Sequence, residues 1–266
     1  MPVAATIGST LIKELNSVLL GMGRYVSPND IRITRWLRAA DQLMNADPVE
    51  ALTVKAITYS LTGNTGQAIY YLDNAAIAGP SNPMVLLNRC TTLTNLGFLS
   101  EAQSVFARVG SPKAGLFPMA ASLGFNCGAF RAMAAVIEEA RKMKLDTDFL
   151  QGAPIEDAAN LLTSKGLDDS FLASQLDVAG EIMREVGTMF MGDAELFVEN
   201  DHEDPLLSLV YQLPVNAYEA EELDSELAIR LIRKKIALSP FVSIGFVSGL
   251  MAENERYPER DTAIRI

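Results

Sequence analysis

A pattern of small, apolar and glycine residues that recurs after about 34 positions constrains the fold of this chain more than any other feature of its sequence. The first unit of the pattern consists of Leu52, Ala56, Tyr59, Gly63, Ala68, Leu72, Ala75 and Pro80. The second unit consists of Leu86, Cys90, Leu93, Gly97, Ala102 and Phe106. A period of this length is typical of helix pairs that stack into a solenoid.

Each unit predicts two helices joined by a turn. The first three pattern residues share one face of a helix that ends at Gly63, because residues three and four positions apart lie on the same side of a helix. The next three apolar residues form the inner face of a second helix. Ala56 and Ala68 allow the two helices to approach closely, and Gly79 followed by Pro80 is a stop signal.

This pattern resembles the signature of the tetratricopeptide repeat over roughly the first half of the chain. The first unit departs from the signature at Leu52, Lys55 and Leu72, where the family usually has tryptophan, leucine and phenylalanine. The second unit has Ala114 in place of the closing proline, and a more divergent third copy runs from 117 to 140. The resemblance implies stacked helical hairpins whose first helices line a concave groove that receives an extended peptide or a helix.

Toward the C-terminus the apolar spacing changes from a helical to a strand period. Before the repeats we expect two helices that cap the stack, and after them a helical hairpin and then two strands, a helix and a strand. The expected helices outside the repeats are 7–20, 30–45, 155–164, 170–186 and 220–238, and the expected strands are 195–199, 206–215 and 241–247. The predicted fold is therefore mainly α, with a solenoid of about three helix pairs followed by a small α+β domain in the order ββαβ.

The same reading divides the chain into four parts. We expect helical repeats over 1–145, a helical hairpin that acts as a cap or connector over 146–189, the α+β domain over 190–250 and a polar tail over 251–266.

Composition narrows the class of protein. The 266 residues, 49% of them hydrophobic, are enough for one large or two modest cores, and no run of about eighteen apolar residues is present. The N-terminus lacks a basic leader followed by an apolar stretch, and Cys90 and Cys127 are expected to be buried free thiols, so we predict a cytoplasmic protein. The net charge of -11 argues against nucleic acid and anionic membrane surfaces as partners.

The resemblance also selects candidate partner-binding residues. The polar residues expected to face the groove are Thr53, Lys55, Thr58 and Thr62 in the first unit and Asn88, Arg89, Thr92 and Asn95 in the second. Of these we select Lys55, Asn88, Arg89 and Asn95, because asparagine amides pair with a peptide backbone and cations pair with carboxylates. The alternative is an ordinary solvated helix face.

Two further groups of charges have both a functional and a structural explanation. Arg32 and Arg35 recur on one side of a helix and are candidates for an acidic peptide or phosphate, although a solvated face balanced by the chain's own acids explains them more simply. In the helix at 220–238, acids precede bases, as the helix dipole favours. These residues are Glu221, Glu222, Asp224, Glu226, Arg230, Arg233, Lys234 and Lys235. We prefer the dipole explanation to a nucleic-acid contact.

The densest polar cluster, Glu199, Asp201, His202, Glu203 and Asp204, includes the chain's single histidine. Its oxygens are suitable for a divalent cation, but the spacing is not that of a calcium-binding loop. The cluster also lies at an expected hairpin turn, where aspartate is common for conformational reasons. We therefore expect no metal site and no cofactor.

No catalytic constellation is present in the sequence, so we expect a protein that is not an enzyme. The main hypothesis is an adaptor or chaperone-like module that binds a partner segment in the groove, with the C-terminal sheet edge available for self-association or a second partner. One alternative is an inhibitor or immunity-type protein that masks a basic enzyme, which suits the charge of -11. A further alternative is a metal-dependent hydrolase that uses the acidic cluster.

Overall fold

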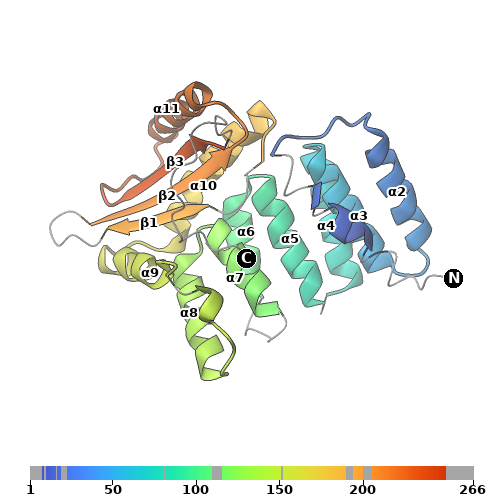
Figure 1. Cartoon of the computed structure of the whole chain (residues 1–266), viewed down its shortest axis with the longest axis horizontal. Helices are drawn as coiled ribbons and strands as arrows, with labels where there is room; N and C mark the ends of the chain where they lie inside the picture. Colours follow the sequence, from blue (N-terminus) through green and yellow to red (C-terminus); the bar gives the residue numbers. More distant parts are fainter. Residues whose placement is uncertain are drawn as a thin grey trace.

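The computed structural model describes residues 8, 10–15, 17–18, 23–80, 82–109, 116–150, 152–189, 194–199 and 205–249. The structure is mainly α-helical, with a small sheet and a helix at its C-terminal end (Figure 1). The helices are α2 (Ile31–Leu43), α3 (Pro48–Leu61), α4 (Thr65–Ala78), α5 (Pro83–Asn95), α6 (Leu99–Phe106), α7 (Phe117–Asn126), α8 (Phe130–Lys142), α9 (Ile155–Ser164), α10 (Asp169–Val186) and α11 (Ala217–Arg233), with a short 3-10 helix at Asp148–Leu150. The strands are β1 (Glu195–Glu199), β2 (Leu206–Leu213) and β3 (Val242–Ser248).

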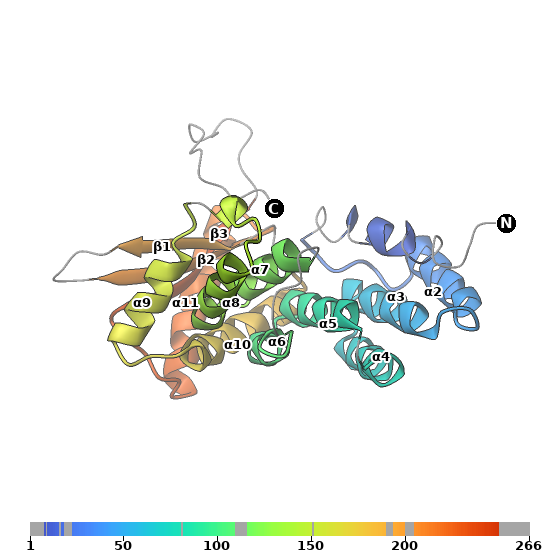
Figure 2. The ribbon, with the colours of Figure 1, turned by 90° about the horizontal axis from the view of Figure 1, so that it is seen from below.

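The three predicted helix pairs are α3 with α4, α5 with α6, and α7 with α8. Figure 2 shows α3 and α5 in one row and α4 and α6 in a second row beside it. Each pair turns at a glycine with positive φ, namely Gly63 (69°), Gly97 (70°) and Gly128 (70°), a conformation that residues with a Cβ rarely adopt. No strand lies between 51 and 108 among the residues that are described there. The sequence pattern thus predicted the stacked hairpins correctly.

The N-terminal residues complete one end of the stack. Helical residues 10–15 pack on α2 and α3, where Leu11 and Leu15 join a cluster with Trp36, Ile57 and Leu61. Residues 23–26 then pass to the end of α10, where the backbone N–H of Tyr25 donates to the carbonyl of Gly187 at 3.0 Å. This segment ties the start of the stack to α10.

The C-terminal sheet has the strand order β1-β2-β3. β1 pairs antiparallel with β2, and β2 pairs parallel with β3 through the α11 crossover, so the predicted order of two strands, a helix and a strand is confirmed. Alternate residues of β2 are buried against the helices, and the Tyr211 hydroxyl donates to the carbonyl of Asn126 at 2.9 Å. The sheet is therefore attached to the end of α7.

Three boundaries of α11 and β2 differ from the sequence prediction. α11 begins at Ala217 rather than 220, because Asn216 and Glu219 form a capping box at its start. It ends at Arg233 rather than 238, before Lys235, which has a φ of 56°. β2 ends at Leu213 rather than 215, since Pro214 has no N–H to continue the ladder.

α10 connects the repeats to the sheet. α6 and α8 have no capping side chain of their own, and α10 supplies both caps. Asp177 accepts from the backbone N–H of Ser100 at 3.0 Å, and Asp169 accepts from two N–H groups at the start of α8, each at 2.9 Å. Arg184 donates to the carbonyls of Leu96 and Gly97 at the end of α5, both at 2.7 Å. One helix thus caps three helices of the repeats.

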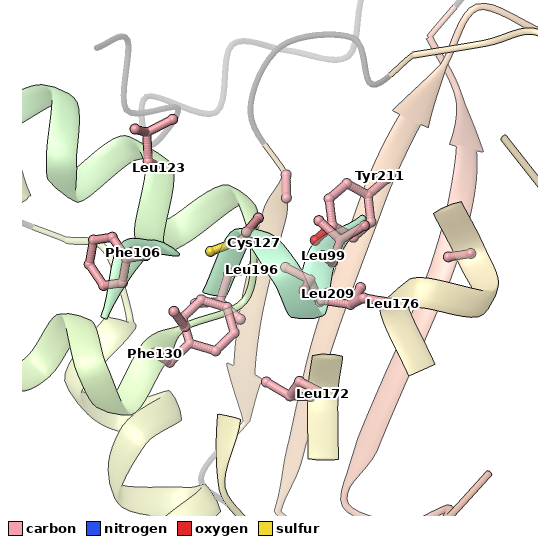
Figure 3. Packing of buried hydrophobic residues seen from close by; sticks show 14 of the residues in the cluster. Leu99, Phe106, Leu123, Cys127, Phe130, Leu172, Leu176, Leu196, Leu209 and Tyr211 are labelled. Atoms are coloured by element: carbon pink, nitrogen blue, oxygen red, sulfur yellow. The ribbon is translucent and has the colours of Figure 1, made fainter. Parts of the chain in front are cut away.

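The larger hydrophobic cluster extends from Leu87 in α5 to Phe246 in β3. It includes Leu99, Phe130, Leu176 and Leu209, which come from the repeats, α10 and the sheet (Figure 3). Residues on both sides of the predicted boundaries at 145 and 189 therefore pack into one cluster. The division into domains stays a prediction, and the predicted tail at 251–266 lies outside the described residues.

Candidate protein-binding surface

The two α2 arginines lie beside Trp36 and have acidic partners within the chain. The guanidinium carbons of Arg32 and Arg35 are 6.0 and 5.9 Å from the centre of the Trp36 ring. Arg32 binds Asp30 at 2.7 Å, and this hydrogen bond lowers the pKa of Asp30 to about 2. Arg35 forms an ion pair with Glu14. These contacts fit the structural explanation of a helix face balanced by the chain's own acids.

Lys55 belongs to α3, and its side chain lies between α2 and α4. Its Nζ is 2.6 Å from Asp41 Oδ1 and 5.2 Å from the centre of the Tyr71 ring, which stacks on Tyr59. Burial alone would lower the pKa of Lys55, but the hydrogen bond to Asp41 and the negative charge around it raise the pKa overall. The Lys55 side chain therefore contacts α2 through Asp41 and α4 through the ring of Tyr71.

Arg89 has an equivalent place one repeat further on. Its guanidinium binds Asp73 of α4 at 2.5 Å, and 18% of its side chain is exposed. A shallow hollow beside it is lined by Ser100, Glu101, Ser104, Val105 and Arg108. Lys55 and Arg89 therefore each form an ion pair with the helix before their own, α2 for Lys55 and α4 for Arg89, and their role in partner binding stays a prediction.

The threonines expected in the groove are mostly buried. Thr53, Thr58 and Thr92 each expose 3% or less of their surface. The hydroxyls of Thr53 and Thr58 donate to backbone carbonyls one helical turn earlier, at 2.9 and 2.7 Å. These hydroxyls are thus occupied within their own helix.

A half-open stripe runs along α5, and it includes both predicted asparagines. The stripe consists of Met84, Asn88, Thr91 and Asn95, which lie on one helix face by their spacing and are all half-buried. Within the described residues, the side-chain amides of Asn88 and Asn95 make no hydrogen bond. On the neighbouring helix α7, Met119 is 43% exposed. We call these four α5 residues the α5 stripe.

The corresponding face of α3 is covered. One period before Asn88, Thr91 and Asn95 are Val54, Ile57 and Leu61, which are buried. They pack in one cluster with Leu11, Leu15 and Trp36 of the N-terminal helices. The chain therefore covers this face on α3 and leaves it partly accessible on α5. Sequence reasoning missed Met84 and Thr91, although their helical spacing with Asn88 and Asn95 was a usable signal.

Four residues of the predicted acidic cluster, Asp201, His202, Glu203 and Asp204, lie outside the described residues. Glu199 is exposed at the end of β1. Among the residues that the structure does describe, no group of three or more histidine, cysteine, aspartate or glutamate side chains is placed to hold a metal ion.

The two cysteines are free and buried, as predicted. The pKa of the Cys127 thiol is raised well above its usual value. Burial is the main cause, and a hydrogen bond with the Cys90 thiol is the second. In the described parts of the chain, no helix combines the length and apolar character needed to cross a bilayer.

Comparison with known proteins gives one informative similarity. Over its N-terminal half, the chain is similar to a tetratricopeptide repeat and J domain-containing co-chaperone of Fusarium oxysporum f. sp. lycopersici, with 31% identity over 146 residues. The match covers 51% of this chain but only 28% of the relative, far less than two thirds of its length. No protein-family model and no solved structure matches the chain. The similarity and the stacked hairpins are together consistent with a tetratricopeptide-like region in the first half.

Proposed function

We propose that this protein is a chaperone-like or adaptor module that binds a segment of another protein on the α5 stripe and the adjoining part of α7. The observation that carries the proposal is the contrast between α3 and α5. The same helix face is covered by the chain's own N-terminal residues on α3 and is half-open on α5. The name of the Fusarium relative, a co-chaperone with tetratricopeptide repeats, supports a role in protein interaction rather than catalysis.

The chemistry of the stripe suits a polypeptide ligand. The amides of Asn88 and Asn95 each offer a donor and an acceptor to a peptide backbone. Met84 and Met119 provide flexible apolar contacts that adapt to different side chains. The chain's net charge of -11 attracts a basic rather than an acidic segment over longer distances. A cytoplasmic location suits the two free thiols.

The basic side chains that the sequence predicted to bind a partner have a smaller part in this proposal. Arg32, Arg35, Lys55 and Arg89 each have an acidic partner within the chain, so a ligand carboxylate would have to replace an existing ion pair. Neither the described residues nor the comparisons supply support for the inhibitor or hydrolase alternatives.

Affinity capture with the full chain tests the proposal. The wild-type protein is compared with Asn88→Ala/Asn95→Ala, and with Gln67→Ala on the exposed side of α4 as a matched amide control. We expect a defined partner to be retained by the wild type and the control. The double variant should bind it more weakly by about 1–3 kcal/mol, or roughly fivefold to 150-fold in Kd. Equal binding by all three proteins would contradict a binding site on the α5 stripe.

A further inference from the structure

The outward face of α11 has no partner within the described residues, although it carries exposed apolar side chains. Five residues at helical spacing make up this face, which we call the α11 stripe: Tyr218, Glu222, Ser225, Ile229 and Ile232. Ile232 is 67% exposed, Tyr218 68% and Ile229 42%. In Figure 1, α11 lies at the margin of the molecule, beyond β3.

The charged residues on α11 and directly after it include two contrasting groups. Those that face inward have partners: Arg230 binds Glu185 and Glu226, and Lys234 binds Glu181. Those beside the stripe do not. Glu221, Arg233 and Lys235 are exposed and form no ion pair within the described residues. The unpaired acid lies in the first half of the helix and the unpaired bases at its end.

We propose that a second copy of this chain docks on the α11 stripe, with the two α11 helices antiparallel and the two-fold axis near Ala228. In this arrangement Glu221 of each copy lies opposite Lys235 of the other, and Glu222 lies opposite Arg233. The exposed isoleucines Ile229 and Ile232 lie near the centre of the contact. A two-fold contact requires a patch that is complementary to itself, and an acid-to-base gradient along one helix meets this requirement only when the helices run in opposite directions.

The sheet edges are less suitable for self-association. An antiparallel pairing of β1 with β1 of a second copy about Phe197 places Glu195 opposite Glu199 at both ends, and like charges at such positions are unfavourable. At the other edge, Asp224 of α11 accepts a hydrogen bond from the backbone N–H of Phe246 in β3 at 3.2 Å. For a chain of net charge -11, association requires a surface with both signs, which the α11 stripe and its flanks supply.

The size of the contact indicates a weak dimer. α11 has 17 residues and is therefore about 25 Å long. A contact of one helix with its copy lies at or below the lower end of the roughly 1,200–2,000 Å² that stable complexes bury. We expect a dimer that depends on protein concentration, with a Kd on the order of micromolar.

Sedimentation equilibrium of the full chain over a range of concentrations tests the dimer. We expect Ile232→Glu and Arg233→Glu/Lys235→Glu each to weaken association by about tenfold or more. Ile77→Glu, at an isoleucine of α4 that is 77% exposed, serves as the matched control and should change nothing. A wild type that stays monomeric at all concentrations, or a control that weakens association as much as Ile232→Glu, would overturn the proposal.

A mixing experiment tests the charge pairing itself. Arg233→Glu/Lys235→Glu and Glu221→Lys/Glu222→Lys are each expected to be mainly monomeric, but an equimolar mixture should dimerise with a Kd near that of the wild type. The summed charge of the mixed pair equals that of two wild-type chains, so recovery reports the local pairing and not net charge. Failure of the mixture to dimerise would refute pairing through these residues.

Cross-linking tests the antiparallel orientation. Ile229→Cys lies on the α11 stripe next to the proposed axis and should form a disulfide-linked dimer with oxidised glutathione. Tyr218→Cys, at the start of the helix, should not link to itself, because its counterpart lies at the opposite end of the contact. Cys90 and Cys127 are buried and do not compete. Linkage of both variants would indicate parallel helices and overturn the proposed geometry.

Discussion

At the scale of single residues, the contact between the repeats and α10 depends on two glycines. A Cβ on Gly180 would lie 1.9 Å from the carbonyl oxygen of Gly97 and 2.6 Å from its carbonyl carbon. Both atoms belong to the backbone of the turn between α5 and α6, so they cannot move aside as a flexible side chain would. The absence of a side chain at Gly180 is what lets Arg184 reach the carbonyls at the end of α5.

We therefore expect Gly180→Ala to lower the free energy of unfolding by roughly 1–3 kcal/mol or more, because α10 must move away from the turn. Gly66→Ala is the matched control, since its Cβ would meet no atom closer than 4.0 Å in helix α4. The control should raise stability by about 0.5–1 kcal/mol. Urea denaturation of both variants measures the difference, and equal stability would show that the glycine contact is not needed.

The buried thiols give a second prediction at this scale. Burial raises the pKa of Cys127, so the neutral thiol persists at neutral pH and little of the reactive thiolate is present. Both native cysteines should react with a chromogenic disulfide reagent only after the protein is denatured. Ser104→Cys, at an exposed position of α6, should react at once and serves as the comparison. Reaction of the native thiols as fast as that variant would contradict the buried placement.

At the scale of secondary-structure elements, local patterns predicted the helices but not the contacts between distant ones. The spacing of Ala56, Ala68 and Leu72 fixes the hairpin of α3 and α4, since these residues interact within a few turns. The caps supplied by α10 join residues far apart in sequence, such as Ser100 and Asp177, and no local signal marks them. The ion pair of Lys55 with Asp41 of α2 also joins residues that no local pattern pairs, and a role of Lys55 in partner binding stays a prediction.

The cap at the start of α6 can be tested separately. Asp177 accepts from the N–H of Ser100 at 3.0 Å and from its hydroxyl at 2.5 Å. Asp177→Ala should cost about 0.5–2 kcal/mol, the usual effect of removing a capping side chain. Asp177→Asn keeps one acceptor oxygen and should cost less. Thermal unfolding followed by circular dichroism compares them, and a negligible loss in the alanine variant would show that the cap contributes nothing to stability.

At the scale of the whole molecule, two hydrophobic clusters account for the described core. The larger one joins α5 to β3, and the smaller one surrounds Trp36 at the other end of the stack. Met189, which follows α10, belongs to the smaller cluster, and its N–H donates to the carbonyl of Gly23 at 2.6 Å. This link predicts that the two clusters unfold together, even though the sequence suggested separate domains.

Leu209→Ala tests this coupling, because Leu209 is fully buried in β2 and its truncation should cost about 2–5 kcal/mol. Trp36 is the chain's single tryptophan and lies in the smaller cluster. Its fluorescence therefore reports on the unfolding of the smaller cluster, whereas Leu209 belongs to the larger one. If the clusters are coupled, the midpoint of the fluorescence transition in urea should fall in the variant by as much as the midpoint followed by circular dichroism. A fluorescence midpoint that stays at the wild-type value, while circular dichroism splits into two steps, would show that the repeats and the sheet fold as independent units. Coincident shifts require the contacts of α10 and of residues 23–26 to transmit the loss of packing in the sheet to the far end of the stack.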